Sequence, residues 1–258
     1  MRALLATAAS LLLIGAAAAE ERPLAFTVAG PLVQPGAHQL LLSVTPRLGR
    51  PEAFTRIESL VGFAYGFSDT VEAQLLLAIA IESFGLDSRS IDGSAATRWR
   101  WQPLNGRSNL IGVGVIGTVA LSVGTVFVET RLALEKWFGD FLFAINLSAD
   151  YVVRKSGAAA PDTHLEQTAG VAYRLSNGFT TGFEVRNRIG FARGNDFGSA
   201  AYAGPVFGYR AAQWWLTLAA LPQVAALKAK SVRENGEALE LRDNERFVFR
   251  VQLGVDVP

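Results

Sequence analysis

A two-residue rhythm of apolar and polar side chains runs along most of this chain, and it is clearest between residues 141 and 153. Every second position there is apolar: Phe141, Phe143, Ile145, Leu147, Ala149, Tyr151 and Val153. The positions between them include Asn146, Ser148 and Asp150. Side chains that alternate with a period of two lie on opposite faces of a β-strand. The pattern therefore predicts a strand with one apolar and one polar face.

The length of this strand indicates its surroundings. Strands in soluble proteins usually have about 5–6 residues, whereas a strand that crosses a membrane needs about 9–11. The alternation over residues 141–153 exceeds both lengths. Polar residues at alternate positions of so long a strand are expected when one face lines a wet interior and the other contacts lipid. We therefore expect a transmembrane β-barrel.

About twelve segments carry this strand pattern. They are 38–48, 54–67, 69–83, 94–103, 108–120, 123–136, 140–154, 163–175, 179–190, 199–210, 213–223 and 245–257. The turns that follow the even-numbered strands are mostly short, and the connections after the odd-numbered strands are mostly longer. The longest connection, 224–244, is polar. Short turns on one side and long loops on the other are typical of outer-membrane barrels, whose long loops face outside the cell. The expected fold class is all-β, a single antiparallel transmembrane barrel of about twelve strands.

The chain divides into three parts. Residues 1–19 have an early Arg2, an apolar stretch and a small-residue site at 17–19, which predicts a cleavable signal peptide rather than an anchor helix. Residues 20–37 are rich in Pro and Gly, and we expect an irregular segment in the periplasm. Residues 38–258 would form the barrel. One alternative concerns Leu110–Val128, which has no charge and approaches the length of a helical span, although its glycines and β-branched residues favour two strands.

Tryptophans lie near the strand ends that this topology assigns to the periplasmic side. They are Trp99, Trp101, Trp137, Trp214 and Trp215. Amphipathic rings favour the membrane–water interface, so we expect a single aromatic girdle there. Ordinary core aromatics are the alternative.

Composition excludes several classes of protein. The chain has 24 Lys+Arg against 23 Asp+Glu, so there is no basic field for a nucleic acid, and no nucleic-acid partner is expected. It has no cysteine, which excludes disulfides, thiolate metal sites and a lipid-anchored cysteine. No phosphate-binding loop or HExxH motif occurs. We therefore expect no cofactor and no metal site.

Strand parity places many charged residues on the inner face of the barrel. The acids are Glu58, Glu72, Glu129, Glu135, Asp150, Glu166 and Glu184, and the bases are Arg98, Arg100, Arg131, Arg154, Arg174, Arg186 and Arg250. Equal numbers predict ion pairs across the lumen and weak ion selectivity, because charges in a narrow lumen are costly unless paired or wetted. These residues could guide a solute, or they could simply fill the barrel. A barrel of this size is expected to be narrow or plugged.

The two histidines of the chain are its candidate catalytic residues. His38 opens the first strand at the periplasmic end, and His164 opens the eighth strand at the other end, near Asp162 and Glu166. A rim Asp–His pair could activate water. The sequence offers no second convergent partner, so we expect no enzyme and no catalytic residue.

Two short motifs resemble a group of proteobacterial outer-membrane barrels. Residues 65–72, Tyr-Gly-Phe-Ser-Asp-Thr-Val-Glu, resemble a strand–turn–strand motif of this group, and Gly204-Pro205 with residues 214–218 and Pro222-Gln223 resemble a later hairpin. The group resembles porins or solute transporters and is largely uncharacterised. Such barrels usually end in an aromatic residue that the barrel assembly machinery reads, whereas this sequence ends in Pro258.

The function expected from these features is that of a narrow pore or facilitator for small polar solutes. The location would be the outer membrane of a Gram-negative bacterium, with export by the signal peptide. Its partners would be outer-membrane lipid, the assembly machinery and a small polar solute. One alternative is a non-conducting structural or docking barrel, and a more remote one is a barrel enzyme that uses His164.

Overall fold

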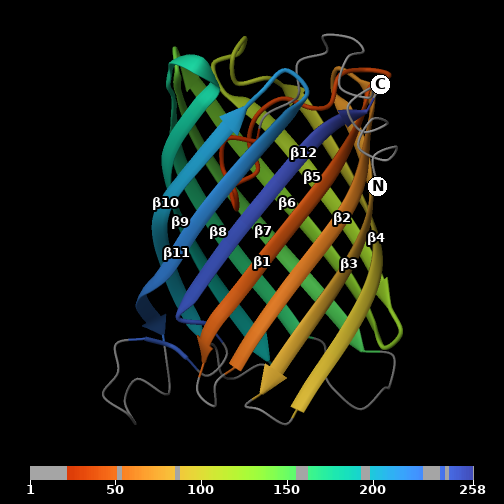
Figure 1. The fold of residues 1–258 in the computed structure, drawn as a ribbon, viewed down its shortest axis with the longest axis vertical. Coiled ribbons are helices and arrows are strands. Elements are labelled where there is room, and N and C mark those ends of the chain that lie inside the picture. The colour runs from red at the N-terminus through yellow and green to blue at the C-terminus, as the bar shows by residue number, and fades with distance from the viewer. Residues whose placement is uncertain are drawn as a thin grey trace, which may run out of the picture.

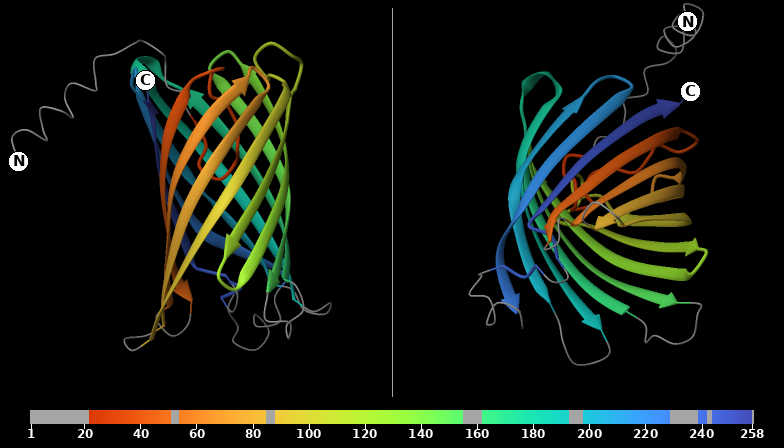
Figure 2. Two further views of the ribbon diagram at one scale, coloured as in Figure 1. Left: turned by 90° about the vertical axis from the view of Figure 1, so that its right-hand side faces the viewer. Right: turned by 60° about the horizontal axis from the view of Figure 1, so that its bottom comes forward.

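The protein is a closed antiparallel barrel in a computed structural model that describes residues 22–50, 54–84, 88–154, 162–192, 198–228, 239–241 and 244–257. The strands are β1 (His38–Arg50), β2 (Phe54–Ser68), β3 (Val71–Phe84), β4 (Ser88–Leu104), β5 (Gly112–Ser122), β6 (Thr125–Phe138), β7 (Phe141–Arg154), β8 (Asp162–Arg174), β9 (Phe179–Ala192), β10 (Ser199–Arg210), β11 (Trp214–Lys228) and β12 (Phe247–Val257). Each strand pairs with its neighbours in the sequence, and β1 pairs with β12 to close the sheet (Figures 1 and 2). The expected fold class is confirmed.

The uncharged stretch Leu110–Val128 contributes to two strands rather than a helix. β5 and β6 pair in antiparallel register from Gly112 with Glu135 to Leu121 with Val126. The helical alternative is therefore wrong, because the glycines and β-branched residues of this stretch suit a sheet. Within the described residues, no helix has the length and apolar content to cross a membrane.

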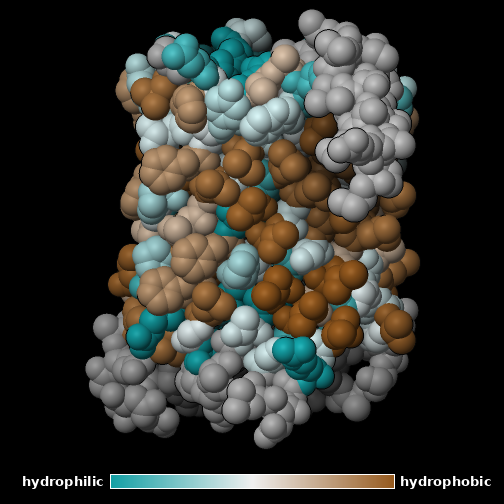
Figure 3. Space-filling view, viewed as in Figure 1, coloured by the Kyte–Doolittle hydropathy of each residue, from teal (hydrophilic) through white to brown (hydrophobic). Residues whose placement is uncertain are grey.

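The outer face of the barrel is apolar and the inner face is polar. On β7, Ile145 and Leu147 are 52% and 49% exposed, while Asn146 between them is 1% exposed. The same contrast holds on β3, where Leu75 and Leu77 are exposed and Gln74 is buried. Figure 3 shows apolar side chains gathered in a broad band across the middle of the face in view. Such a band is what a lipid-facing barrel surface requires.

We call the end where β1 begins and β12 ends the termini end, and the opposite one the loop end. The termini end carries the tight turns Asp69-Thr70 and Gly139-Asp140, in agreement with the sequence-based topology. One pair of connections departs from the pattern. Residues 105–111, between β4 and β5, form a longer connection at the termini end, and residues 123–124, between β5 and β6, form a tight turn at the loop end.

The predicted aromatic girdle is partly wrong. Trp99 and Trp101 are 52% and 53% exposed on the outer face, as a girdle requires, but Trp137 and Trp215 are 8% and 1% exposed. Trp137 has the inward parity of Glu135 on β6. Adjacent residues of a strand face opposite sides, so Trp214 and Trp215 cannot both contact lipid. Two of the five tryptophans therefore pack inside the barrel.

Residues 22–33, which we call the inner segment, lie inside the barrel in its termini half (Figure 2). Leu24 and Phe26 are each 2% exposed and pack against side chains of the inner wall. The sequence-based expectation placed this segment outside the barrel, in the periplasm. Its irregular conformation agrees with that expectation, but its location does not. The chain leaves the lumen beside β2, where the N–H of Gly36 donates to the carbonyl oxygen of Gly66 (2.8 Å) and the N–H of Gly66 donates to that of Ala37 (3.2 Å).

The close crossing at Gly66 depends on the absence of a side chain. A Cβ atom at this position would lie 2.2 Å from the carbonyl oxygen of Gln34 and 2.3 Å from that of Val33. No side chain fits at such distances, so glycine at position 66 allows the chain to pass close to β2 where it leaves the lumen.

Candidate functional site: the lumen and its inner segment

The inner segment has no strand partner for most of its length, and side chains of the barrel wall bind its backbone instead. Glu184 on β9 is the main acceptor. Its carboxylate accepts hydrogen bonds from the backbone N–H groups of Ala25 (3.0 Å), Phe26 (3.0 Å) and Thr27 (2.7 Å). Glu184 is 0% exposed. A buried carboxylate is costly without partners, and three converging donors compensate for this cost.

Three further wall residues continue this pattern along the inner segment. Glu135 on β6 accepts from Gly30 N (2.6 Å), and Glu72 on β3 accepts from Val33 N (2.9 Å). Asn146 on β7 accepts from the N–H of Val28 and donates to its carbonyl oxygen (3.0 Å). The amide of Asn146 thus binds one residue much as a neighbouring strand would.

Arginines of the wall bind the carbonyl groups of the same segment. Arg100 on β4 donates to the carbonyl oxygens of Gly30 and Pro31. Arg131 on β6 donates to Phe26 O (3.1 Å), and Arg250 on β12 donates to Ala25 O (3.1 Å). The guanidinium of Arg250 also lies 4.0 Å from the centroid of the Phe26 ring, a cation–π contact.

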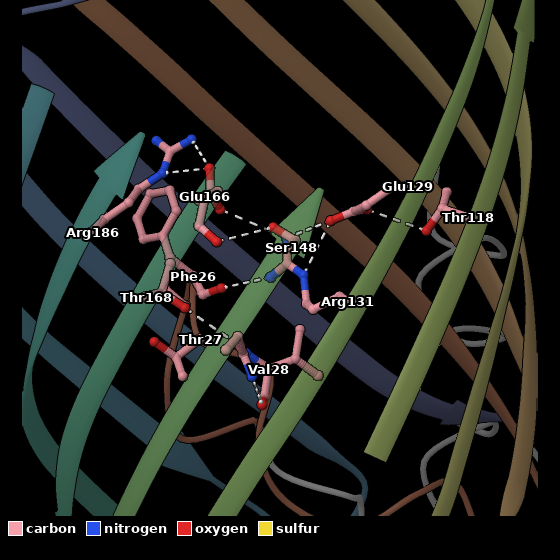
Figure 4. A network of polar contacts seen from close by, with 12 residues as sticks. Phe26, Thr27, Val28, Thr118, Glu129, Arg131, Ser148, Glu166, Thr168 and Arg186 are labelled. Carbon is pink, nitrogen blue, oxygen red and sulfur yellow. Dashed lines mark hydrogen bonds and ion pairs between the residues drawn. The ribbon is translucent and has the colours of Figure 1, made fainter. Parts of the chain in front are cut away.

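Beside Phe26, four charged residues from β6, β8 and β9 form a chain of ion pairs (Figure 4). Arg131 contacts Glu129 (2.7 Å) and Glu166 (3.7 Å), and Glu166 in turn contacts Arg186 (2.5 Å). Thr118 on β5 extends the chain through a hydrogen bond to Glu129 (3.3 Å). The parity argument placed these four charged residues on one face, and the closed sheet brings them into contact.

A second group of ion pairs lies toward the loop end. Glu58 on β2 contacts Arg47 on β1 (3.0 Å) and Arg56 (2.9 Å). Glu245, just before β12, contacts Arg50 (2.5 Å). The list of inward charges drawn from the sequence included Glu58 and missed the others. Arg47 and Arg56 could have been found from the same alternation, whereas Glu245 lies outside any strand pattern.

The remaining predicted residues are more scattered. Arg98 donates to Thr118 Oγ1 (3.1 Å), and Arg174 stacks over the Trp137 ring at 5.0 Å. Asp150 pairs with His164 (2.7 Å between Oδ1 and Nδ1). The side chain of Arg154 lies outside the described part of the structure. Arg174 is therefore near the termini end.

The Asp150–His164 pair was not anticipated, because Asp162 and Glu166 were the acids considered for His164. The pair has the geometry of an oriented imidazole, but no nucleophile contacts it among the described residues. In the same residues, no cluster of three or more His, Asp or Glu side chains could hold a metal ion. The polar residues of the lumen instead bind peptide groups and one another.

A cavity of about 460 Å³ lies beside the inner segment. Its walls come mainly from β1 to β5 and from β11 and β12. Arg22 of the inner segment lines it on one side, and Asp92 and Gly124 line it near the loop end. The lumen therefore has a segment-filled part toward the termini end and a hollow part that extends toward the loop end.

Residues 123–257, just over half of the chain, match the family described as "Family of unknown function (DUF6662)". The chain belongs to this family. The match covers β6 to β12 and thus includes Glu129, Arg131, Glu166, Glu184 and Arg186. No curated protein matches this member of the DUF6662 family.

Several solved structures have a similar fold. The COG4313 outer membrane channel from Pseudomonas putida F1 has a TM-score of 0.63 at 11% identity, covering 88% of this chain and 97% of the channel. The NanC porin has a TM-score of 0.54 at 11% identity, covering 84% of this chain and 98% of the porin. The KdgM porin has a TM-score of 0.52 at 7% identity, with coverage of 84% and 98%. The resemblance to porin-like outer-membrane barrels is confirmed at the level of fold.

Proposed function

We propose that this DUF6662 member resides in the outer membrane and gives small polar solutes a narrow route across it, restricted by the inner segment. The observation that carries the proposal is the contrast between a lipid-compatible outer face and a hollow, charged interior. An apolar band alone would suit any membrane barrel. A cavity of about 460 Å³ that is lined partly by charged side chains gives a small solute room inside the barrel.

The proteins of similar fold support this proposed function, but the proposal does not depend on them. They include an outer membrane channel and two porins, and the KdgM porin has also been solved in a complex with disordered oligogalacturonate. Identities of 7–11% support a shared fold, so the route proposed here rests on the interior of this chain.

The alternative is a non-conducting barrel that serves as a structural or docking element. The inner segment is the observation that favours it, because wall side chains bind backbone groups at Ala25, Phe26, Thr27, Val28, Gly30 and Val33. A segment held at so many points reduces the cross-section available to a solute.

Conductance in a planar lipid bilayer separates the two functions. The purified protein is compared with a variant that lacks residues 22–33, and the heat-modifiable folded form is verified for both. We expect a small conductance for the wild type and a several-fold larger one for the deletion. If both proteins are folded and neither conducts, the route is wrong and the structural barrel is favoured.

A further inference from the structure

The aromatic ring of Phe26, in the inner segment, lies against two arginines of the barrel wall. The centroid of the ring is 4.0 Å from the guanidinium of Arg250 on β12 and 5.2 Å from that of Arg186 on β9. Figure 4 shows the ring beside Arg186. Both distances are within the range of cation–π contacts, and Phe26 is only 2% exposed. The ring therefore covers part of the surface of each guanidinium group.

The wall of the barrel fixes the position of this ring. The backbone N–H of Phe26 donates to Glu184 (3.0 Å), and its carbonyl oxygen accepts from Arg131 (3.1 Å). The side chain belongs to a buried apolar cluster with Tyr202 and Val248 of the inner wall. A side chain that is held by packing and by hydrogen bonds of its own backbone keeps one position. Phe26 is thus a fixed part of the lumen.

The two arginines differ in the carboxylates that neutralise them. Arg186 contacts Glu166 at 2.5 Å. Arg250 donates to Thr45 Oγ1 (3.1 Å) and to the carbonyl oxygen of Ala25 (3.1 Å), and no carboxylate among the described residues forms an ion pair with it. A guanidinium group stays charged at every physiological pH. Arg250 is therefore a positive charge in the lumen whose direct partners are neutral.

Phe26 also lies between the cavity and the chain of ion pairs. Arg250 lines the cavity, whereas Arg186 and Glu166 do not. The ring contacts Arg250 at the edge of the cavity and Arg186 outside it. Loss of the ring would extend the cavity toward Arg186 and uncover a further part of Arg250.

We propose that Phe26 is a specificity-determining residue of the route through the barrel. Its ring keeps small anions away from Arg250 and Arg186, so that these charges attract anions less than open guanidinium groups would. This inference rests on the proposed function for its role in permeation. The covering of the two arginines is a property of the folded protein and can be measured without conduction.

The covering is tested by chemical modification of arginine in the full-length folded protein in detergent. Butanedione, a small uncharged reagent for guanidinium groups, is applied for increasing times, and the modified peptides are quantified by mass spectrometry. We expect Arg250 to react several-fold faster in Phe26→Ala than in the wild type. Arg98 is the internal control, because it lines the cavity and its hydrogen bond is to Thr118. An unchanged rate at Arg250 would overturn the proposal.

Two further variants separate the ring from a general loosening of the inner segment. Leu24→Ala is the matched control, because Leu24 is also 2% exposed in the same segment but packs against Leu142 and Ala172 instead. The same acceleration at Arg250 in this variant would overturn the assignment to Phe26. Phe26→Leu keeps an apolar side chain and should accelerate the reaction to a smaller extent, so it decides the question if Phe26→Ala does not give the heat-modifiable folded form.

The reversal potential under a salt gradient tests the role in permeation. We expect the permeability ratio of chloride to potassium to rise about twofold in Phe26→Ala and to stay at the wild-type value in Leu24→Ala. Faster modification of Arg250 with no change of this ratio would overturn the role in specificity and leave the pore intact. Folded wild type and variant that do not conduct would instead overturn the pore, while the modification rates would still decide whether Phe26 covers Arg250.

Discussion

Glu184 in the middle of β9 accepts a hydrogen bond of 2.7 Å from the backbone N–H of Thr27, across 157 residues of sequence. The same carboxylate binds two neighbouring N–H groups. A carboxylate accepts from several donors at once, whereas an amide offers a single oxygen and brings two donors of its own. Glu184 therefore determines how firmly the inner segment is seated in the lumen.

The first prediction concerns this seating. Glu184→Gln should loosen the inner segment, because hydrogen bonds to charged groups contribute about 1.5–3 kcal/mol and the amide retains only part of them. The chain has no cysteine, so Thr27→Cys provides one thiol for labelling. We expect a water-soluble maleimide to label this thiol roughly tenfold faster when Glu184→Gln is added, since about 1.4 kcal/mol corresponds to tenfold.

Glu82→Gln is the control for this experiment, because Glu82 pairs with Arg56 and binds no part of the inner segment among the described residues. Equal labelling rates for the two glutamine variants would show that Glu184 does not hold the segment.

The second prediction concerns the lipid face of β7. Leu147 is 49% exposed on the outside, whereas the Ser148 hydroxyl donates inward to the carbonyl oxygen of Glu166 (3.5 Å). Leu147→Arg should prevent stable insertion, because an arginine that faces lipid near the bilayer midplane costs about 2–4 kcal/mol. Ser148→Arg should be tolerated next to Glu166. Loss of the heat-modifiable form to the same degree in both variants would contradict the assignment of the faces.

The third prediction concerns orientation. The β11–β12 connection includes Asn235, which lies outside the described residues, and it joins strands at the loop end. We predict that this end faces outside the cell, since long loops are extracellular in such barrels. An epitope tag inserted at Asn235 should react with antibody on intact cells. A signal that requires permeabilised outer membranes would reverse the orientation.

The fourth prediction concerns acid. Burial raises the pKa of Glu245, but Arg47 and Arg50 outweigh burial and hold this pKa below its ordinary value. A lowered pKa in the folded state means that the stabilisation is complete above the unfolded value of about 4.3 and is lost as the pH falls through the folded value.

The test is the temperature at which the folded form is lost, measured at pH 7 and at pH 3. Glu245→Gln should lower this temperature at pH 7 and have a smaller effect at pH 3, because pH 3 lies below the unfolded pKa and part of the stabilisation by the charge is then already lost. A difference between variant and wild type that is the same at both pH values would rule out this role for the Glu245 charge.

The fifth prediction concerns ion selectivity. Arg131 contacts both Glu129 and Glu166, so Arg131→Ala leaves two acids with fewer counter-charges. We expect the reversal potential under a salt gradient to shift toward cation preference, because selectivity follows the excess charge that lines the narrow section. Arg174→Ala should have a smaller effect, since Arg174 stacks on Trp137 near the termini end. Equal shifts would contradict this placement of the charges.

The strands and their facing could be predicted from the sequence to a large extent. Alternation is a local property, because each residue of a strand points opposite to its neighbour whatever the rest of the chain does. It is sufficient to place Leu147 outside and Glu166 and Glu184 inside. It also contains the information that separates Trp214 from Trp215, although position near a strand end led to both being assigned to the girdle.

The location of residues 22–33 could be decided only by the tertiary structure. This segment has no periodic pattern, and its partners Glu72, Glu135, Asn146 and Glu184 come from four different strands. Closure of the sheet between β1 and β12 brings the side chains of these four residues into one interior. Buried carboxylates there need hydrogen-bond donors, and the backbone N–H groups of a segment without a strand partner need acceptors. The sequence alone determined which residues of each strand form the inner and the outer face of the barrel wall, because the alternation of side chains along a strand is a local property. The contents of the lumen depend on contacts between residues that only the closed barrel brings together.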